Sequence, residues 1–213
     1  IFKKLYTIIK MNNESQDIIK SFTVVKEMLT DRNIDISNLE SYSESEIEVL
    51  NSASNTSGTK NGNIFQIKVN DDIKIIYHMK SKFIKNDLKK FLSTIEKDEE
   101  YKHIIFIFKE KINNNNEKNI QDLLEGVTYE LFPIRNLLFN ITKHSYVPKH
   151  ELLSTDEASE IMKRYSIKNK SQFPIILKSD PVARYYDFKP GQLIKVYRSS
   201  TATGESITYR YCV

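Results

Sequence analysis

The sequence has 213 residues, of which 39% are hydrophobic and 28% are charged. These proportions supply enough apolar surface for a core and predict one large domain or two small ones. The formal net charge is +4, with lysines and arginines spread along the chain rather than gathered in one block. Such a mild positive balance is compatible with work near nucleic acid, but it is more typical of an ordinary basic protein.

The single cysteine and the short apolar runs indicate in which kind of compartment we expect the protein. With Cys212 as the single cysteine, the sequence can form neither an internal disulfide nor a cysteine metal cage. We therefore expect a reducing compartment, and no catalytic thiol, because no activating base lies near Cys212. Apolar runs have strand length, short of the roughly 20 residues of a membrane helix, so no membrane partner is expected. The sequence starts at Ile1 rather than methionine, and the expectation of no signal peptide concerns these residues alone.

Residues 1–135 have the pattern of an α/β domain. Apolar residues recur at spacings of three and four over 15–32, which predicts a helix. Strands 64–69 and 73–77 are expected to form a hairpin around Asn70-Asp71-Asp72. The other predicted elements are a helix at 44–50, a loop at 51–63, a helix at 82–97, a strand at 103–108, an asparagine loop at 113–116, a helix at 117–125 and a strand at 127–132. This alternation predicts a mixed sheet with flanking helices.

A second, smaller domain is predicted over residues 136–213. Ser154 and Glu157 form a capping box in front of a helix whose apolar face contains Ala158, Ile161, Met162 and Tyr165. Asp180 and Pro181 are suited to the first positions of another short helix. These helices with the strands around them predict a small α+β domain.

The end of this domain reads as two strands joined by a turn. Residues 189–192 have proline and glycine at the centre of a type II turn. Strands are expected at 193–197 and 207–211, with a turn near Gly204. Along the second strand, alternation places Ile207, Tyr209 and Tyr211 on one side and Thr208, Arg210 and Cys212 on the other.

Enzyme chemistry finds little support in the sequence. Gln66 and Lys68 with Asp71 and Asp72 faintly resemble the end of a nuclease core, but glutamine takes the place of an acid and both aspartates lie in a turn. His144, His150 and Asp156 lack the spacing of a metal site, because Pro148 breaks any helix between the histidines. The five glycines form no phosphate loop. We expect no catalytic residue, metal or cofactor.

A basic and aromatic set in the last third is ambiguous. It consists of Arg184, Lys189, Lys195, Arg198 and Arg210 with Tyr185, Tyr186, Tyr197 and Tyr209. Basic residues interleaved with aromatic ones can bind nucleic acid. Arginine and tyrosine are also enriched in protein interfaces. The residues alone favour the two interpretations equally.

Several short motifs in the last third carry a family resemblance. They are Val147-Pro148-Lys149-His150, Asp180-Pro181-Val182-Ala183-Arg184-Tyr185, Lys189-Pro190-Gly191-Gln192, Arg198-Ser199-Ser200, Gly204 and Thr208-Tyr209-Arg210. In order and spacing, residues 136–213 resemble the C-terminal module of the small shared subunit of eukaryotic and viral DNA-directed RNA polymerases. The module is also similar to the short homologue in archaeal RNA polymerases, which consists of this module alone. Residues 1–135 resemble the family's jaw domain in layout only. Asp187 stands where the family usually has glycine.

The resemblance implies a non-catalytic subunit that takes part in transcription. Residues 136–213 would be an assembly domain with a mixed four-stranded sheet, docking on the largest polymerase subunit beside other subunits. Residues 1–135 would form part of a jaw that contacts downstream double-stranded DNA weakly and without sequence specificity. The implied interface candidates are Pro148, His150, Asp180, Pro181, Arg184, Tyr185, Gly191, Arg198, Tyr209 and Arg210.

The sequence also leads to expectations about the protein's location and leaves other functions open. The resemblance implies the nucleus for a cellular protein, and the virion or a cytoplasmic viral factory for a large DNA virus. Two other function classes stay open on the residues alone. One is a nuclease-like α/β enzyme, which would require acidic side chains converging on the first sheet. The other is a free nucleic-acid-binding protein, for which the net charge of +4 is weak support.

Overall fold

The computed structural model describes residues 2–40, 64–80, 101–124, 126–200 and 204–213, with isolated positions between 43 and 89. It divides into two compact units, residues 1–139 and 140–213. The sequence placed a junction four residues earlier, after residue 135. The elements predicted at 44–50, 51–63 and 82–97 lie almost wholly outside the described residues. In the described part, none of the helices has the length and apolar character that crossing a membrane requires.

The first unit starts with a long helix, α1 (Phe2–Asp31). The prediction that this helix begins at residue 15 is wrong, because residues 2–14 contain no glycine or proline that would interrupt it. The predicted apolar stripe is confirmed for five side chains, which are buried: Ile18, Phe22, Val25, Met28 and Leu29. A short helix that the sequence did not predict, α2 (Ser37–Glu40), follows. Asp35 precedes it and accepts a hydrogen bond from the Ser37 amide at 3.0 Å.

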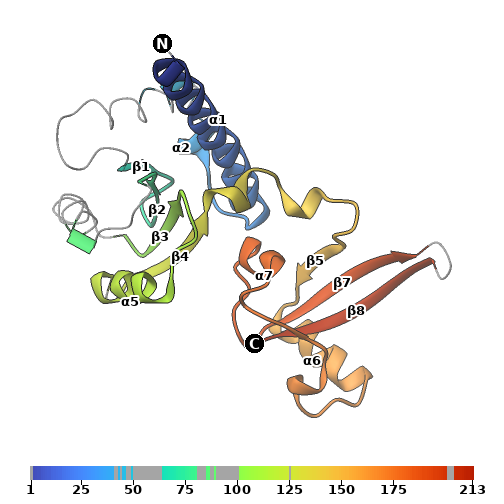
Figure 1. Cartoon of the computed structure of the whole chain (residues 1–213). Coiled ribbons are helices and arrows are strands. Elements are labelled where there is room, and N and C mark those ends of the chain that lie inside the picture. Colours follow the sequence, from blue (N-terminus) through green and yellow to red (C-terminus); the bar gives the residue numbers. More distant parts are fainter. Residues whose placement is uncertain are drawn as a thin grey trace. The chain divides into compact units, whose positions relative to one another are not determined.

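The sheet of the first unit contains four strands in sequence order (Figure 1). They are β1 (Ile64–Lys68), β2 (Ile73–His78), β3 (His103–Phe108) and β4 (Thr128–Pro133). The pair β1–β2 is antiparallel, whereas β2–β3 and β3–β4 are parallel. The predicted hairpin and mixed sheet are therefore confirmed. Asn70 forms the turn by accepting hydrogen bonds from the amides of Asp72 and Ile73.

The helix α5 (Asn114–Leu123) connects β3 to β4. The prediction of a loop at 113–116 is wrong, since Asn113 is the N-cap and residues 114–116 form the first turn of the helix. The Asn113 side chain accepts a hydrogen bond from the Asn116 amide at 2.8 Å, which is the usual role of asparagine at this position. A run of asparagines can therefore begin a helix when its first member is the cap.

The core of the first unit surrounds β2 and β3. All six residues of β2 are buried, as expected for a strand covered on both faces. One cluster packs α5 against the sheet through Ile64, Ile76, Tyr101, Ile104, Phe106, Phe108, Ile120 and Leu124. From α1, the Ser21 hydroxyl lies 3.2 Å from the buried Tyr77 hydroxyl. Burial raises the pKa of Tyr77 far above its ordinary value, while the hydrogen bond with Ser21 opposes the shift.

The second unit contains the other four-stranded sheet, with the order β5-β7-β8-β6 (Figure 1). Its strands are β5 (Lys149–Leu152), β6 (Ile175–Ile176), β7 (Leu193–Ser200) and β8 (Gly204–Cys212). Because β5–β7 and β7–β8 are antiparallel and β6–β8 is parallel, the predicted mixed sheet is confirmed. The hairpin strands extend beyond the predicted ranges. Single-turn helices lie nearby in the chain: η1 (Ile134–Leu137) in the first unit, and η2 (Ile141–Lys143) and η3 (Lys170–Gln172) in the second.

Local capping in the second unit agrees with the sequence predictions. Ser154 and Glu157 form a reciprocal capping box in front of α6 (Thr155–Arg164). Asp180 accepts a hydrogen bond from the Val182 amide at 2.8 Å in front of α7 (Pro181–Tyr185). In the predicted turn, the Gln192 amide donates to the Lys189 carbonyl at 3.2 Å. Gly191 has φ of 92°, a conformation that glycine adopts without strain.

Helices α6 and α7 cover opposite sides of the sheet in the second unit. Side chains of Ala158 and Ile161 from α6 pack with Phe173 and Leu193, and Tyr209 and Tyr211 lie against them. On the other side, the cluster consists of Ile176, Ala183, Phe188, Ile194, Val196 and Cys212. We call these the α6-side and α7-side faces. Successive side chains along a strand point to opposite faces of the sheet. Each residue of β7 and β8 therefore lies on either the α6-side or the α7-side face.

Candidate functional site

The ten interface candidates divide into three groups. One group maintains the fold, one lies on the α6-side face, and one lies on the α7-side face. The first contains Pro148, Pro181, Tyr185 and Gly191, the second contains Tyr209, and the third contains His150, Asp180, Arg198 and Arg210, with Arg184 on α7. The sequence did not separate these groups.

The first group has structural roles that are visible in its contacts. Tyr185 is 4% exposed, and its hydroxyl accepts a hydrogen bond from Asn140 Nδ2 at 2.8 Å. Gly191 donates its amide to the Cys212 carbonyl and accepts a hydrogen bond from Lys170 Nζ at 2.9 Å. Pro148 presents its carbonyl to His150. We therefore expect substitutions of these residues to disturb the fold of the second unit itself, and not an interface alone.

Tyr209 lies on the α6-side face, away from Arg210. Its ring contacts the rings of Tyr165 and Phe173 edge-on, at centroid distances of 5.9 and 6.2 Å. This packing anchors α6 to the hairpin. The predicted alternation along the second hairpin strand is thus confirmed. Tyr209 and Arg210, which belong to the same basic and aromatic set in the sequence, therefore lie on opposite faces of the sheet.

The α7-side face gathers His150, Arg198 and Arg210. His150 on β5 is paired with Val196 on β7, and Val196 is paired with Thr208 on β8. Arg198 follows Val196 by two residues, and Arg210 follows Thr208 by two, so both arginines share the face of Val196. The motifs around positions 150, 198 and 210, far apart in sequence, are brought together by strand pairing.

His150 is buried and lies in the electrostatic field of both arginines. His150 is 9% exposed, and its Nδ1 donates to the Pro148 carbonyl at 2.7 Å. Burial lowers the pKa of His150, and the charges of Arg210 and Arg198 lower it further. The Pro148 carbonyl and Asp180 oppose this shift. His150 is therefore a neutral ring near two cations at neutral pH.

The two arginines differ in how they are held. Arg210 is half-buried, and its Nη1 donates to the Ile175 carbonyl at 3.0 Å. Arg198 is exposed, and no hydrogen bond or ion pair joins its guanidinium to any residue within the described ranges. Arg184 is half-buried on α7. The two strand arginines of the face are thus one fixed and one exposed guanidinium.

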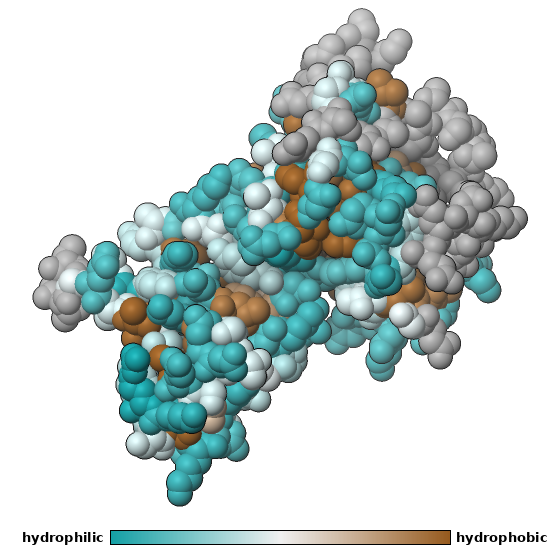
Figure 2. All heavy atoms as spheres, turned by 180° about the vertical axis from the view of Figure 1, so that it is seen from behind, coloured by the Kyte–Doolittle hydropathy of each residue, from teal (hydrophilic) through white to brown (hydrophobic). Residues whose placement is uncertain are grey.

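The α6-side face has a second, different polar group. The ammonium groups of Lys149 and Lys195 lie over the Tyr197 ring, at 5.3 and 4.7 Å from its centroid. The Tyr197 hydroxyl donates to Glu151. These charges already have partners within the chain. Figure 2 shows hydrophobic patches between hydrophilic side chains on one view of the second unit.

Within the described residues, the structure offers no support for a nuclease or a metal site. Among the residues that are described, no three His, Cys, Asp or Glu side chains gather in a metal-binding arrangement. Asp71 pairs with Lys68 at 3.0 Å and Asp72 with Lys102 at 2.6 Å, so the two acids do not converge. Burial raises the pKa of the Cys212 thiol, which keeps it protonated and unreactive.

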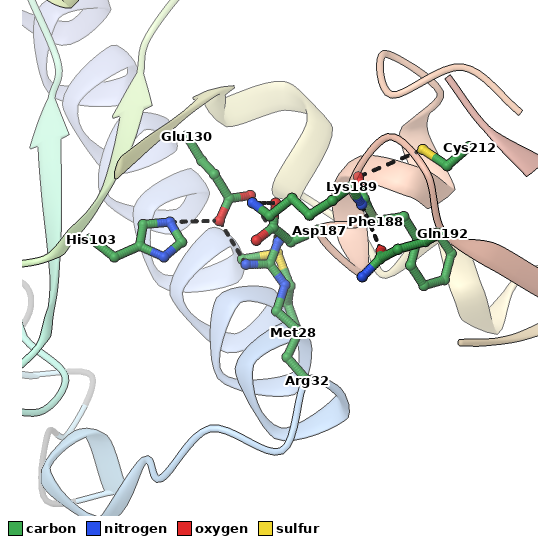
Figure 3. A network of polar contacts seen from close by, with 9 residues as sticks. All are labelled: Met28, Arg32, His103, Glu130, Asp187, Phe188, Lys189, Gln192 and Cys212. Atoms are coloured by element: carbon green, nitrogen blue, oxygen red, sulfur yellow. Dashed lines mark hydrogen bonds and ion pairs between the residues drawn. The ribbon is translucent and has the colours of Figure 1, made fainter. Parts of the chain in front are cut away.

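The first unit contains a buried ionic network that the sequence did not reveal (Figure 3). Glu130 on β4 forms an ion pair with Arg32 at 2.7 Å, and its Oε1 lies 2.9 Å from Nε2 of His103 on β3. Burial favours a raised pKa for Glu130, but hydrogen bonds and charges from His103 and Arg32 outweigh it and lower the pKa to about 2. Arg32 Nη2 also contacts Met28 Sδ at 3.5 Å. The network links the end of α1 to two strands.

Figure 3 also shows polar contacts of the second unit around the turn before β7. Asp187 has a positive φ of 53° and accepts a hydrogen bond from Lys189 Nζ at 2.6 Å. The Lys189 amide donates to Gln192 Oε1 at 2.7 Å, and Cys212 Sγ contacts the Phe188 carbonyl at 3.8 Å. Asp187 thus adopts a left-handed backbone conformation that glycine tolerates better than a residue with a side chain.

Comparison with known proteins identifies the family. A family profile described as RNA polymerase Rpb5, C-terminal domain, matches residues 139–212. A DNA-directed RNA polymerases I, II, and III subunit from Dictyostelium discoideum is 36% identical over 145 residues, which cover 67% of this chain and 73% of the relative. The chain belongs to the RNA polymerase Rpb5 family. Subunits with the same description from Caenorhabditis briggsae and Caenorhabditis elegans are each 40% identical over 96 residues, or 45% of either chain.

Membership in the Rpb5 family settles the broad function. The chain is a non-catalytic subunit of a DNA-directed RNA polymerase and takes part in transcription. The expected family, fold class and lack of catalysis are confirmed. The Rpb5 profile covers the whole second unit except its last residue, so the α7-side face lies within the matched region.

Proposed function

We propose that residues 140–213 dock this chain on the largest polymerase subunit, beside other subunits, through the α7-side face. The observation that carries the proposal is the gathering of His150, Arg198 and Arg210 on this face by strand pairing. The fold itself does not require an exposed arginine at position 198. Arginine is one of the residue types that dominate binding energy in protein interfaces.

Neighbouring apolar surface supports the same face. Leu152 is 45% exposed at the end of β5, and its partner in register is Ile194, a core residue of the α7-side face. An apolar side chain beside cations gives the mixed character of a typical interface. Burial of Leu152 against a partner would therefore remove apolar surface from water, and the arginines would add specific polar contacts.

Affinity purification of the tagged full chain from its native source tests the docking proposal. We expect two very large polymerase subunits to be recovered in near-equal amount with the wild-type chain. The variant Arg198→Ala should recover less of them, while Arg164→Ala should recover as much as wild type, because Arg164 is an exposed arginine on α6. Recovery of the chain alone would contradict the proposal.

We also propose that residues 1–139 form part of a jaw near downstream DNA. In this unit, Lys111 and Lys118 are exposed before and within α5, and they are our candidates for phosphate contacts. Such contacts would be weak and independent of sequence. In contrast, Lys68 and Lys102 already pair with Asp71 and Asp72.

The DNA proposal is tested with the assembled polymerase on a downstream duplex. Replacing Lys111 and Lys118 with alanine should reduce the salt dependence of binding, by a slope of about 0.9 for each phosphate contact that is lost. The loss should be similar for duplexes of different sequence. If the slope of the salt dependence were unchanged, Lys111 and Lys118 would not contact DNA phosphates.

For location, we propose the nucleus if the protein is cellular. If it comes from a large DNA virus, we propose the virion or a cytoplasmic viral factory. The support is family membership, since the relatives are subunits of RNA polymerases I, II and III. Fluorescence microscopy of the tagged chain in its source cells distinguishes these locations.

A further inference from the structure

The charged groups that act on His150 are unevenly balanced. Two guanidinium groups, of Arg198 and Arg210, act on His150 together with a single carboxylate, that of Asp180. The Asp180 carboxylate is occupied as the N-cap of α7, where it accepts from the Val182 amide. The Arg198 guanidinium has no carboxylate partner within the described part of the chain. An anionic partner would complete the face.

The spacing of the two arginines defines the partner further. Arg198 is paired with Ser206 on β8, and Arg210 lies four residues along the same strand. At the rise of a β-strand, four residues correspond to roughly 13 Å. Arg210 retains free guanidinium donors beyond the single bond to the Ile175 carbonyl, since guanidinium offers five N–H groups. Two anionic groups at about this separation would match both arginines.

We propose that the α7-side face recognises an acidic segment of the polymerase subunit on which it docks, with two carboxylates of that segment paired to Arg198 and Arg210. This inference rests on the proposed docking function and adds the chemistry of the partner. Carboxylates suit guanidinium groups because they accept two parallel hydrogen bonds.

A peptide carboxylate fits this face better than a nucleic-acid phosphate backbone. Asp180 lies close enough to influence His150, and it would repel a continuous row of phosphates. Leu152, 45% exposed on the same face, offers apolar contact that a phosphate backbone does not use. Moreover, the cations are two isolated groups rather than a stripe that follows a strand of nucleic acid.

The first test compares Arg198→Gln with Arg198→Glu in the tagged full chain, by the amount of large subunit retained after a salt wash. Gln removes the attraction, whereas Glu also introduces repulsion. We expect Gln to lower retention several-fold and Glu to lower it about tenfold more, as for close charge pairs at interfaces. Arg164→Gln and Arg164→Glu are the matched controls and should retain wild-type levels. Thermal unfolding of each variant checks that it is folded.

The outcomes separate the two proposals. If wild type recovers no large subunit, the docking function fails and this inference fails with it. If wild type recovers the large subunits but Gln and Glu at position 198 are equivalent, only the acidic partner is contradicted. If nuclease treatment of the extract abolishes the difference between Gln and Glu, the partner is nucleic acid, which also overturns the inference.

A second test identifies the carboxylate directly. The variant Arg198→Lys keeps the positive charge and places a primary amine on the face. In the purified complex, a carbodiimide joins amines only to carboxylates in contact. We expect position 198 to be linked to an aspartate or glutamate of a polymerase subunit, and Arg164→Lys to give no such link at position 164. A complex without a link at position 198 would contradict the inference.

Discussion

Two sets of charged residues, one in each unit of this chain, are used in opposite ways. In the first unit, Arg32 forms an ion pair with Glu130 inside the fold, and His103 contacts the same carboxylate; the three side-chain exposures are 5%, 12% and 17%. In the second unit, Arg198 extends from the sheet with no ion pair in the described part of the chain. The contrast shows that charge alone does not indicate function: the inward network stabilises one unit, whereas the outward arginine is available to a partner.

The largest expected effect comes from breaking the inward network. Glu130→Ala leaves the Arg32 guanidinium buried without its carboxylate, which typically costs about 3 kcal/mol. We expect the free energy of unfolding of the first unit to fall by about this amount in guanidinium chloride titrations. Asp71→Ala is the matched control, because the exposed pair of Asp71 with Lys68 should change stability by less than about 1 kcal/mol. Equal effects of the two substitutions would contradict the account.

The same network predicts a dependence of stability on pH. The pKa of Glu130 is lowered from 4.5 to about 2 in the folded chain. A group with a lowered folded pKa stabilises the fold above its unfolded pKa, and this contribution disappears as the pH falls toward 2. The stability difference between wild type and Glu130→Gln should therefore shrink between pH 5 and pH 2. A constant difference over that range would contradict this role.

A smaller effect is expected at Asn140, the first residue of the second unit. Its Oδ1 accepts from the Thr142 amide at 2.9 Å, and its Nδ2 donates to the buried Tyr185 hydroxyl at 2.8 Å. Losing the cap and the buried hydrogen bond should together destabilise the unit by about 2 kcal/mol in Asn140→Ala. Asn140→Asp keeps the acceptor for the cap and should recover about half of this loss. Thermal denaturation of both variants measures the difference.

The smallest effect, of opposite sign, is expected at Asp187. This residue has a φ of 53°, which glycine adopts without the steric penalty of a side chain. Asp187→Gly should raise stability by about 0.5 kcal/mol, since the lost ion pair with partly exposed Lys189 contributes little. Asp187→Ala, which keeps the penalty and loses the pair, should be less stable than wild type. If glycine were also destabilising, the ion pair would outweigh the strain.

Local signals in the sequence predicted much of the fold. The capping box of Ser154, the Asp180 cap and the turn at Gly191 each depend on residues close together in sequence, and all three are confirmed. The start of α1 was missed because no residue near position 15 marks or excludes a helix start. The Asn113 cap was missed because asparagine is common both in loops and at helix N-termini.

The candidate site could be predicted only in part. The motifs lie within the region that the family profile matches, and strand alternation placed Tyr209 and Arg210 on opposite sides. Sequence could not show that His150, from a separate segment, lies beside Arg198, because this depends on the pairing of β5 with β7. For the same reason it could not pair Arg32 with Glu130, which are 98 positions apart.

The most direct test of the contrast between the two units is a structure of the polymerase purified from the native source. The account predicts that the Arg198 side chain is buried against an acidic segment of the largest subunit, while Glu130 remains paired with Arg32 inside the first unit. An α7-side face that is exposed to solvent in the assembled polymerase, or covered by nucleic acid, would contradict it.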